Sequence, residues 1–322
     1  MRCVPAAPSP GPNAPPQESG PRIPLVEESS RAYQAGIVLI KVVKMLLSLL
    51  QANATVMDVE ANLRTIDDAA RRASHAGAGI LLTPELFPVG YAPLRLHAEL
   101  DAATLPSIRE RLADIARTHG IGLVYSLPAP VNGTHDDGAK PPRADSAWNI
   151  TATLLDATGA EVLTYAKVHL FGPEEHKAFI GAQEPPAVVE FQGIRTSMLI
   201  CYDVEFPEAV RAAAVRGAEL LLVPTALSAG FDNVPQVLIR ARALESQLNV
   251  AYANHTGHED VYNFLGGSVV AGPDGSLLAA AGDSPTLLFA EVGTDSVKAA
   301  REEVPYLRER RPELYGKWDQ RS

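Results

Sequence analysis

The sequence predicts an α/β protein, because apolar runs of strand length alternate with amphipathic helical segments along the chain. The alternation occurs twice, once in each half, which implies two facing sheets, although a doubly wound parallel sheet is equally compatible with the pattern alone. The chain has 322 residues, of which 46% are hydrophobic and 20% are charged. This composition is ordinary for a globular protein with a large core.

In the first half, apolar residues at helical spacing follow Asp58 and stop before Gly77, and they predict an amphipathic helix. This helix leads into a strand that starts at Ile80 and ends at Glu85. The other elements predicted in this half are a helix through Ile108 and Ala116, a strand over 121–127, a polar loop over 133–142, and a hairpin of strands over 148–155 and 161–167.

The second half repeats the pattern of strand, helix and strand. Its predicted elements are a strand over 195–201, a helix over 208–216, a strand over 220–224, a helix over 235–247, and strands over 250–254, 268–271 and 287–292. Residues 1–34, in contrast, are rich in proline and poor in apolar residues, which predicts a disordered tail.

Charge and cysteine content exclude several classes of function. The formal charge is −10, which argues against nucleic acid and anionic membranes as partners, since nucleic-acid binders concentrate basic residues. The longest apolar stretch, 35–50, is interrupted by Lys41 and Lys44 and is too short to span a membrane. The two cysteines, Cys3 and Cys201, provide no disulfide framework, so we expect a cytoplasmic protein in a reducing environment.

Cys201 ends an apolar run at the start of a polar turn. An unpaired cysteine is most often a small buried hydrophobic residue, and this interpretation applies to Cys201 taken alone. Two distant segments have the same form, because one apolar strand ends at Glu85 and another ends at Lys167. A carboxylate, an ammonium group and a thiol therefore each stand at the end of a strand, and together they favour nucleophilic catalysis.

In this chain order, Glu85, Lys167 and Cys201 resemble the Glu-Lys-Cys triad of the nitrilase, or carbon-nitrogen hydrolase, superfamily. Their spacings are 82 and 34 residues, and the resemblance extends over 45–315, including the Gly-Pro-Asp-Gly turn at 272–275. The resemblance implies a four-layer α-β-β-α sandwich in a single catalytic domain, with the triad at one edge and a first strand over 44–51. It also implies three regions, namely a disordered extension over 1–44, a hydrolase domain over 45–293, and a C-terminal extension over 294–322 that packs on a neighbouring subunit.

The resemblance also implies a role for each triad residue. Cys201 is the nucleophile that forms a thioester acyl-enzyme, and Glu85 is the general base that takes its proton. Lys167 and the backbone amide of Tyr202 stabilise the oxyanion. Relatives place a second glutamate shortly after the lysine; this chain offers Glu174 and Glu175, of which we favour Glu175, while either could simply face solvent.

The residues around the triad indicate the substrate class. Cys201 is followed by Tyr-Asp rather than by the Trp-Glu of nitrile-specific relatives, which favours an amide. The segments over 234–254 resemble bacterial short-chain aliphatic amidases such as 5-aminopentanamidase, and they imply a small linear amide, including amides with an ω-amino group. The substrate-binding residues that family geometry implies are Tyr91, Trp148, Glu174, Tyr202, Ala226, Asp232 and Asn254.

Other signals are weaker. His255 and His258 form a His-x-x-His pair without a third ligand nearby, and no nucleotide-binding motif is present, so we expect neither a metal nor a cofactor. Asp203 is expected to be a buried, paired group that orients the cysteine turn. An N-carbamoyl amide hydrolase or a nitrilase is the enzymatic alternative. A catalytically silent member that acts as a binding or scaffold protein is the alternative of another class, and relatives imply a dimer or larger homo-oligomer.

Overall fold

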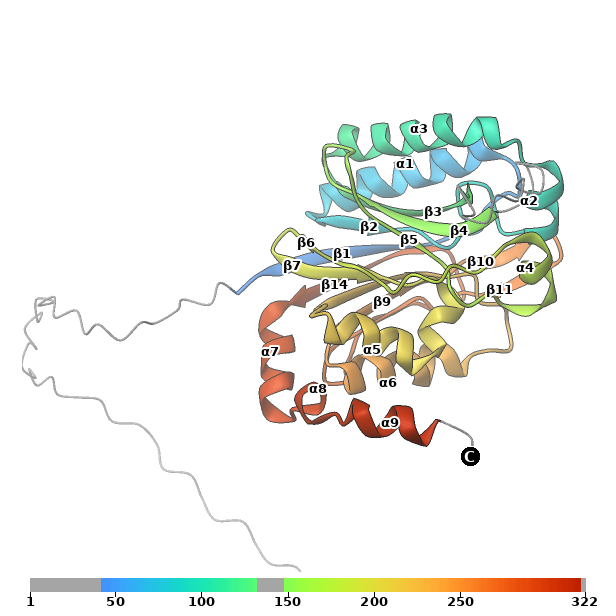
Figure 1. Ribbon diagram of the computed structural model, residues 1–322. Coiled ribbons are helices and arrows are strands. Elements are labelled where there is room, and N and C mark those ends of the chain that lie inside the picture. Colours follow the sequence, from blue (N-terminus) through green and yellow to red (C-terminus); the bar gives the residue numbers. More distant parts are fainter. Residues whose placement is uncertain (1–41, 132–147, 320–322) are drawn as a thin grey trace, which may run out of the picture. The chain divides into compact units, whose positions relative to one another are not determined.

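The computed structural model describes residues 42–131 and 148–319, which form four layers in the order helices, sheet, sheet, helices (Figure 1). The predicted α-β-β-α sandwich is confirmed. The sequence pattern alone was also compatible with one doubly wound parallel sheet, and the structure has two sheets instead. Residues 1–41 of the disordered extension predicted over 1–44, and the predicted loop over 133–142, lie outside the described residues, whereas Lys44 of that extension already begins a strand.

Within the described residues, the first sheet contains six strands in the order β14-β1-β2-β3-β4-β5. Their bounds are β1 Lys44–Gln51, β2 Ile80–Leu82, β3 Gly122–Pro130, β4 Trp148–Leu155, β5 Glu161–Ala166 and β14 Thr286–Gly293. β1, β2 and β3 are parallel, whereas β4, β5 and β14 join antiparallel. β14 comes from the end of the chain and pairs with β1 from Lys44 against Gly293 to Gln51 against Thr286, so the C-terminal half completes the first sheet.

The second sheet has the order β13-β12-β9-β8-β7-β6 in the described part of the chain. Its strands are β6 Val188–Phe191, β7 Ile194–Met198, β8 Leu220–Pro224, β9 Asn249–Ala253, β12 Val269–Ala271 and β13 Leu277–Ala280. β7, β8 and β9 form its parallel centre, and β8 and β9 pack against β1, β2 and β3 of the first sheet. Both parallel centres read as continuous apolar runs because they are covered on both faces.

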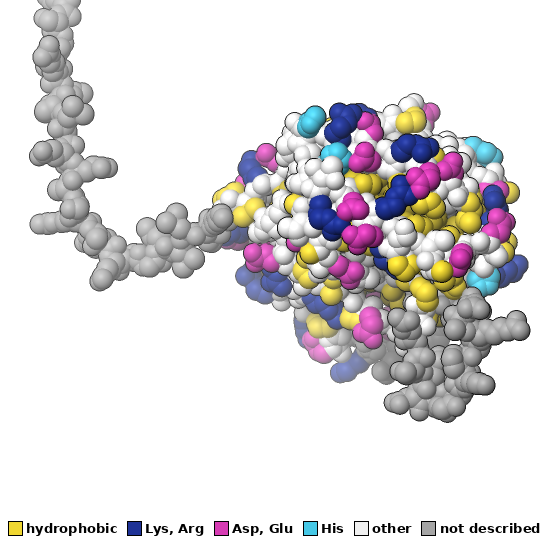
Figure 2. All heavy atoms as spheres, turned by 90° about the horizontal axis from the view of Figure 1, so that it is seen from above, with side chains coloured by type: hydrophobic (Ala, Val, Ile, Leu, Met, Phe, Trp, Pro, Cys, Tyr) yellow, Lys and Arg dark blue, Asp and Glu magenta, His cyan; other side chains and the backbone are white. Residues whose placement is uncertain are grey.

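Helices α1 (Val59–His75) and α3 (Leu105–His119) cover the first sheet, and α5 (Pro207–Val215) and α6 (Ile239–Ser246) cover the second (Figure 1). The Asp58 side chain caps α1 by accepting a 2.9 Å hydrogen bond from the amide of Ala61. Gly120 ends α3 in the left-handed region at φ 60°, which glycine adopts without strain. The polar faces of α1 and α3 carry acidic and basic side chains side by side (Figure 2).

Several elements were not predicted from the sequence. They include α2 Pro93–Glu99, the 3₁₀ turns Ala102–Thr104 and Cys201–Glu205, α4 Gly172–Ala178, β6 Val188–Phe191, and a separate hairpin of β10 Thr256–Glu259 and β11 Tyr262–Leu265. The helix predicted over 235–247 forms as the π-helical turn Val234–Leu238 followed by α6. These elements are short, and α4, the 3₁₀ turn Cys201–Glu205 (the cysteine turn) and β10 bury polar residues, for which an apolar period gives no signal. α4, the cysteine turn and β10 contribute directly to the site described below.

The C-terminal segment forms α7 Thr294–Glu303, α8 Tyr306–Glu309 and α9 Pro312–Trp318. α7 is held to its own chain, because the Gln247 side chain donates to the carbonyls of Ala300 at 2.6 Å and Val304 at 2.5 Å. Packing of 294–322 on a neighbouring subunit stays a prediction. Among the described residues, no helix has the length and apolar character needed to cross a membrane.

Candidate active site

The predicted triad lies where strand ends of the two sheets meet. Glu85 follows β2, Lys167 follows β5, and Cys201 follows β7. The amide of Glu85 donates to the carbonyl oxygen of Thr225, which follows β8, at 3.2 Å, so the segment carrying the carboxylate is bonded to the second sheet. Because the carboxyl ends of the parallel strands share this edge, distant parts of the chain converge there.

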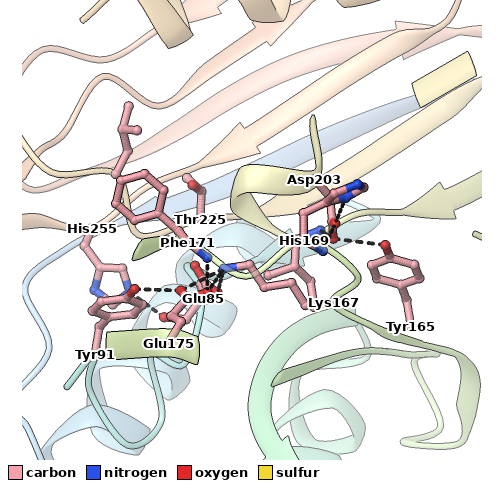
Figure 3. A network of polar contacts seen from close by, with 12 residues as sticks. Glu85, Tyr91, Tyr165, Lys167, His169, Phe171, Glu175, Asp203, Thr225 and His255 are labelled. Atoms are coloured by element: carbon pink, nitrogen blue, oxygen red, sulfur yellow. Dashed lines mark hydrogen bonds and ion pairs between the residues drawn. The ribbon is translucent and has the colours of Figure 1, made fainter. Parts of the chain in front are cut away.

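Lys167 is the centre of a buried ionic cluster (Figure 3). Its ammonium nitrogen lies 2.7 Å from Glu85 Oε1, 2.8 Å from Glu175 Oε1 and 2.9 Å from Glu175 Oε2. All three side chains are at most 1% exposed, and two carboxylates therefore surround one ammonium group. Such a buried cluster is retained only when the partners compensate one another, so the loss of any one member is costly.

Burial and charge shift the pKa values in this cluster. Burial raises the pKa of Glu85 to about 7, with the attraction of Lys167 acting against this shift and the charge of Glu175 acting in its favour. Burial alone would lower the pKa of Lys167, but Glu85 and Glu175 raise it well above its usual value. Lys167 is therefore a permanent cation, whereas the Glu85 carboxyl is poised to exchange a proton near neutral pH.

The thiol of Cys201 interacts with the Glu85 side chain. Lys167 occupies Glu85 Oε1, whereas Oε2 is buried and has no partner among the described hydrogen bonds. Interaction with the Cys201 thiol lowers the pKa of Glu85, while burial and the negative charge of Glu85 raise the pKa of the thiol. At rest the pair is thus a protonated thiol next to a proton acceptor.

The cysteine turn holds the thiol in a strained backbone. Cys201 has a φ of 47°, in the left-handed region that residues other than glycine seldom adopt, and it starts the 3₁₀ turn Cys201–Glu205. Strain of this kind costs on the order of 1–3 kcal/mol and persists only where the surroundings enforce it. Cys201 is 7% exposed in this turn.

Asp203 enforces this turn, as predicted for a buried orienting residue. One carboxylate oxygen accepts from the Tyr165 hydroxyl at 2.9 Å and from the Ile200 amide at 3.3 Å. The other accepts from the backbone amide and from Nδ1 of His169, both at 2.8 Å (Figure 3). Since His169 lies two residues after Lys167, Asp203 also ties the cysteine turn to the lysine segment.

The structure separates the two candidate glutamates. Glu175 is 1% exposed and reaches Lys167, and it also accepts from the Tyr91 hydroxyl at 2.7 Å and the Phe171 amide at 2.8 Å. Glu174 points elsewhere and accepts a hydrogen bond from the Tyr262 hydroxyl. Only Glu175 is part of the lysine cluster.

The predicted substrate-binding residues occupy different surroundings. Tyr91 is buried against Glu175, and the backbone amide of Ala226 interacts with the Cys201 thiol and lowers its pKa. Tyr202 is half-buried, with its ring edge-on to Phe171 at 5.2 Å. Trp148 is buried at the start of β4, where its carbonyl accepts from the Ile180 amide.

Among the described residues, Asn254 and Asp232 form no hydrogen bond or ion pair with the lysine cluster. Asn254 is buried, and its side chain accepts from the Leu227 amide and donates to the carbonyls of Leu227 and Gly266. It therefore holds the loop that follows β8. Asp232 is exposed and lines a surface pocket of about 470 Å³ together with Gly282 and Asp283.

Sequence reasoning missed the surroundings of His255. This histidine was noticed only as half of a His-x-x-His pair, yet it is fully buried between Glu259 and the carbonyl of Glu85. Within the described residues, no group of three His, Cys, Asp or Glu side chains is arranged to hold a metal ion. The sequence did contain one signal for this contact, namely Glu259 four positions after His255.

Comparison with known proteins decides the family. The family model for carbon-nitrogen hydrolases matches residues 46–302. The chain belongs to the carbon-nitrogen hydrolase family. A hydrolase of Pseudomonas protegens, encoded in the pqqF 5′ region, is 36% identical over 290 residues, which cover 90% of this chain and 97% of that protein. The 2-oxoglutaramate amidase of Bacillus subtilis is 29% identical over 74% of this chain and 87% of its own.

Solved structures of this carbon-nitrogen hydrolase family agree. The crystal structure of an amidase from Nesterenkonia sp. superposes with a TM-score of 0.76 and 46% identity, covering 85% of this chain and 96% of that one. A mutant of that amidase carries the acetamide moiety of fluoroacetamide covalently added at its active-site cysteine. The predicted membership of this family is thus confirmed, and Cys201, Glu85 and Lys167 form a site that suits acyl transfer through a thiol.

Proposed function

We propose that this carbon-nitrogen hydrolase converts small linear aliphatic amides to carboxylic acids and ammonia through a thioester on Cys201. The observation that carries the proposal is the buried cluster in which Lys167 binds Oε1 of Glu85 while Oε2 is unpaired and the Cys201 thiol interacts with the same carboxyl. An amide is a poor electrophile, and a covalent route divides its hydrolysis into two easier steps.

In the first step, Glu85 removes the thiol proton as the Cys201 sulfur attacks the amide carbon. The carbonyl oxygen takes the negative charge, which the Lys167 ammonium group and the backbone amide of Tyr202 stabilise. The intermediate then collapses, the carbon–nitrogen bond breaks, and the proton on Glu85 moves to the departing nitrogen. Ammonia and a thioester result.

In the second step, Glu85 takes a proton from water, and the resulting hydroxide attacks the thioester carbon. The carbon–sulfur bond breaks, the thiolate recovers a proton from Glu85, and the carboxylic acid leaves. Because the pKa of Lys167 lies well above its usual value, this residue acts throughout as a fixed charge and not as a proton donor.

Glu175 positions the lysine in this scheme. It binds the ammonium nitrogen through both carboxylate oxygens, and it is itself held by Tyr91 and Phe171. A lysine held on two sides retains little rotamer freedom, so its charge is already in place when the oxyanion forms.

The relatives support an amide substrate and differ in its acyl group. The Nesterenkonia amidase has been crystallised with acrylamide, and the Bacillus relative is named for 2-oxoglutaramate. We place this chain with the small linear amides, including those with an ω-amino group. Glu174 and Asp232 are the acidic residues proposed to attract such a cationic end.

An N-carbamoyl amide hydrolase, a nitrilase and a catalytically silent binding protein are the alternatives. The first releases carbon dioxide with ammonia, the second turns over nitriles, and the third turns over none of these compounds. We also propose that the protein is cytoplasmic, since a working thiol suits a reducing compartment. We further propose a homo-oligomer, since Leu244 on α6 and Val237 in the preceding turn expose apolar side chains.

The deciding experiment measures ammonia release from short aliphatic amides, ω-amino amides, N-carbamoyl compounds and nitriles, with Cys201→Ala measured in parallel. We expect turnover of amides that the variant lacks, without carbon dioxide. For the ω-amino preference, Glu174→Gln and Asp232→Asn are compared with the unmodified protein on amino and neutral amides of equal length. Folded protein that hydrolyses none of the panel would contradict the proposed amide hydrolysis. An unaltered preference for ω-amino amides in both variants would contradict the role of Glu174 and Asp232.

A further inference from the structure

His255 is a fully buried histidine that the proposed mechanism does not use. It directly follows β9, and both of its ring nitrogens have hydrogen-bond partners. Nε2 lies 2.6 Å from the backbone carbonyl oxygen of Glu85, and Nδ1 lies 2.6 Å from Oε1 of Glu259. The residue therefore contacts the segment that carries the general base.

The two partners fix the protonation of the ring. A carbonyl oxygen only accepts hydrogen bonds, so Nε2 must carry a proton. Glu259 also accepts from the amides of Ala54 at 2.7 Å and Tyr91 at 3.1 Å, one on each carboxylate oxygen, and these two backbone donors favour the ionised carboxylate, which can only accept from Nδ1. Nδ1 must therefore carry a proton as well, and a ring with both protons is an imidazolium cation.

The surroundings suit a cation. The ring of His255 packs against those of Phe87 and Phe264, with centroid distances of 5.5 and 4.9 Å. The ionised groups whose charges act on it are the carboxylates of Glu259 and Glu85. Burial acts to lower the pKa of His255, but these two carboxylates and the hydrogen bonds raise it above its usual value.

Glu259 extends the contact to the second glutamate. Its Oε2 accepts from the backbone amide of Tyr91, whose hydroxyl donates to Glu175, and Glu175 binds Lys167. Lys167 binds Glu85, and Glu85 binds His255 through its carbonyl. The polar contacts thus form a closed ring that holds both glutamates of the site, as the left part of Figure 3 shows for its labelled members.

We propose that His255 is a permanently charged positioning residue, an imidazolium that fixes Glu85 through its backbone while Glu259 serves as counter-ion and fixes Tyr91 and Glu175. The cluster then contains three carboxylates and two cations. The charge state follows from geometry alone, whereas the positioning of a general base rests on the proposed function.

The charge state is tested on the unmodified protein by NMR of ¹⁵N-histidine. We expect two ring N–H signals for His255, assigned by contacts to the protons of Phe87 and Phe264, which persist at a pH well above the usual histidine pKa of ~6.5. A single ring N–H signal at neutral pH would show a neutral imidazole and overturn the proposal. This readout requires neither turnover nor a variant.

The positioning role is tested with matched substitutions. His255→Gln keeps a donor near the Nε2 position without the charge, so the pKa of Glu85 rises and the acid limb of kcat/KM moves to higher pH. His255→Leu also loses the donor, and we expect kcat to fall roughly 10- to 100-fold with little change in KM, since small displacements of catalytic groups have effects of this size. His258→Gln alters an exposed histidine three residues further on, in β10, and is expected to change neither the acid limb nor kcat.

Unchanged profiles in folded His255→Gln and His255→Leu would refute the positioning role. If either variant fails to fold, the remaining one and the NMR signals still decide. If the unmodified protein hydrolyses no amide, the proposed function fails separately, and the pH profile is instead taken from alkylation of Cys201 by iodoacetamide.

Discussion

The backbone amide of Glu85 donates to the carbonyl oxygen of Thr225 at 3.2 Å, and this bond joins the segment after β2 of the first sheet to the segment after β8 of the second. Thr225 in turn donates to Ala253 at the end of β9. The carboxylate of Glu85 is therefore positioned by both sheets, and its chemistry depends on how they pack.

The pH dependence of turnover should report the ionisation of Glu85. Burial raises the pKa of this carboxyl to about 7, and only the ionised form can accept the thiol proton. We expect kcat/KM to fall about tenfold per pH unit below about 7 and to level off above it. Steady-state rates across the pH range measure this, and an acid limb near the usual glutamate pKa of ~4.3 would contradict the assignment.

Alkylation should distinguish Cys201 from Cys3. Burial and the charge of Glu85 raise the pKa of the Cys201 thiol, so its reactivity depends on proton transfer to Glu85 rather than on free thiolate. With iodoacetamide, we expect labelling of Cys201 to rise with pH through about 7, and the label on Cys3 in the same digests serves as the internal reference. Mass spectrometry of digests at successive pH values measures both sites, and Glu85→Gln should slow Cys201 alone.

Glu175 and Glu174 form a matched pair of adjacent residues. Glu175→Gln places an amide nitrogen among donors from Lys167, Tyr91 and Phe171. We expect a loss of about 2–3 kcal/mol in the free energy of unfolding, because buried donors to a charged acceptor lose their partner. A loss of roughly 100-fold in kcat/KM should accompany it, because the ammonium group is displaced.

Glu174→Gln is the control for this substitution. Its contact is a hydrogen bond from the Tyr262 hydroxyl, which a glutamine oxygen can still accept, and we expect a change within about 0.5 kcal/mol. Urea unfolding and kinetics on neutral amides check both variants. Equal effects of the two substitutions would show that the assignment of Glu175 is wrong.

Asp203→Asn should relax the cysteine turn. The carboxylate accepts from Tyr165, Ile200 and twice from His169, and an asparagine nitrogen cannot accept. We expect the free energy of unfolding to fall by about 2–3 kcal/mol and kcat/KM to fall with it, since Cys201 is held at a φ of 47°. Tyr165→Phe removes one donor only and should have a smaller effect; an unaffected rate in folded Asp203→Asn would contradict this role.

The elements that the sequence predicted best are buried strands with sharp boundaries. β4 (Trp148–Leu155) and β8 (Leu220–Pro224) have the predicted bounds, because β4 alternates apolar and polar residues up to the turn after Leu155, and β8 is a continuous apolar run. β10 escaped detection because Gly257 and His258 interrupt any strand pattern, and its two buried residues, Thr256 and Glu259, are polar. Their burial depends on partners far away in the sequence.

In the candidate site, too, some residues could be predicted from local sequence and others depend on distant partners. Glu85, Lys167 and Cys201 were identified from strand ends and from resemblance to a family, and the sequence also indicated the orienting role of Asp203. Which acid reaches Lys167 depends on the direction of α4, and the tie between His255 and Glu85 spans 170 residues. Neither could follow from local pattern, because both depend on tertiary packing.

Because the hydrogen bond between Glu85 and Thr225 joins the two sheets, turnover depends on the packing of one sheet against the other. A slip of one sheet over the other would part the base from the thiol while leaving every helix and strand intact. Under increasing urea, hydrolysis should therefore cease before circular dichroism registers any loss of secondary structure.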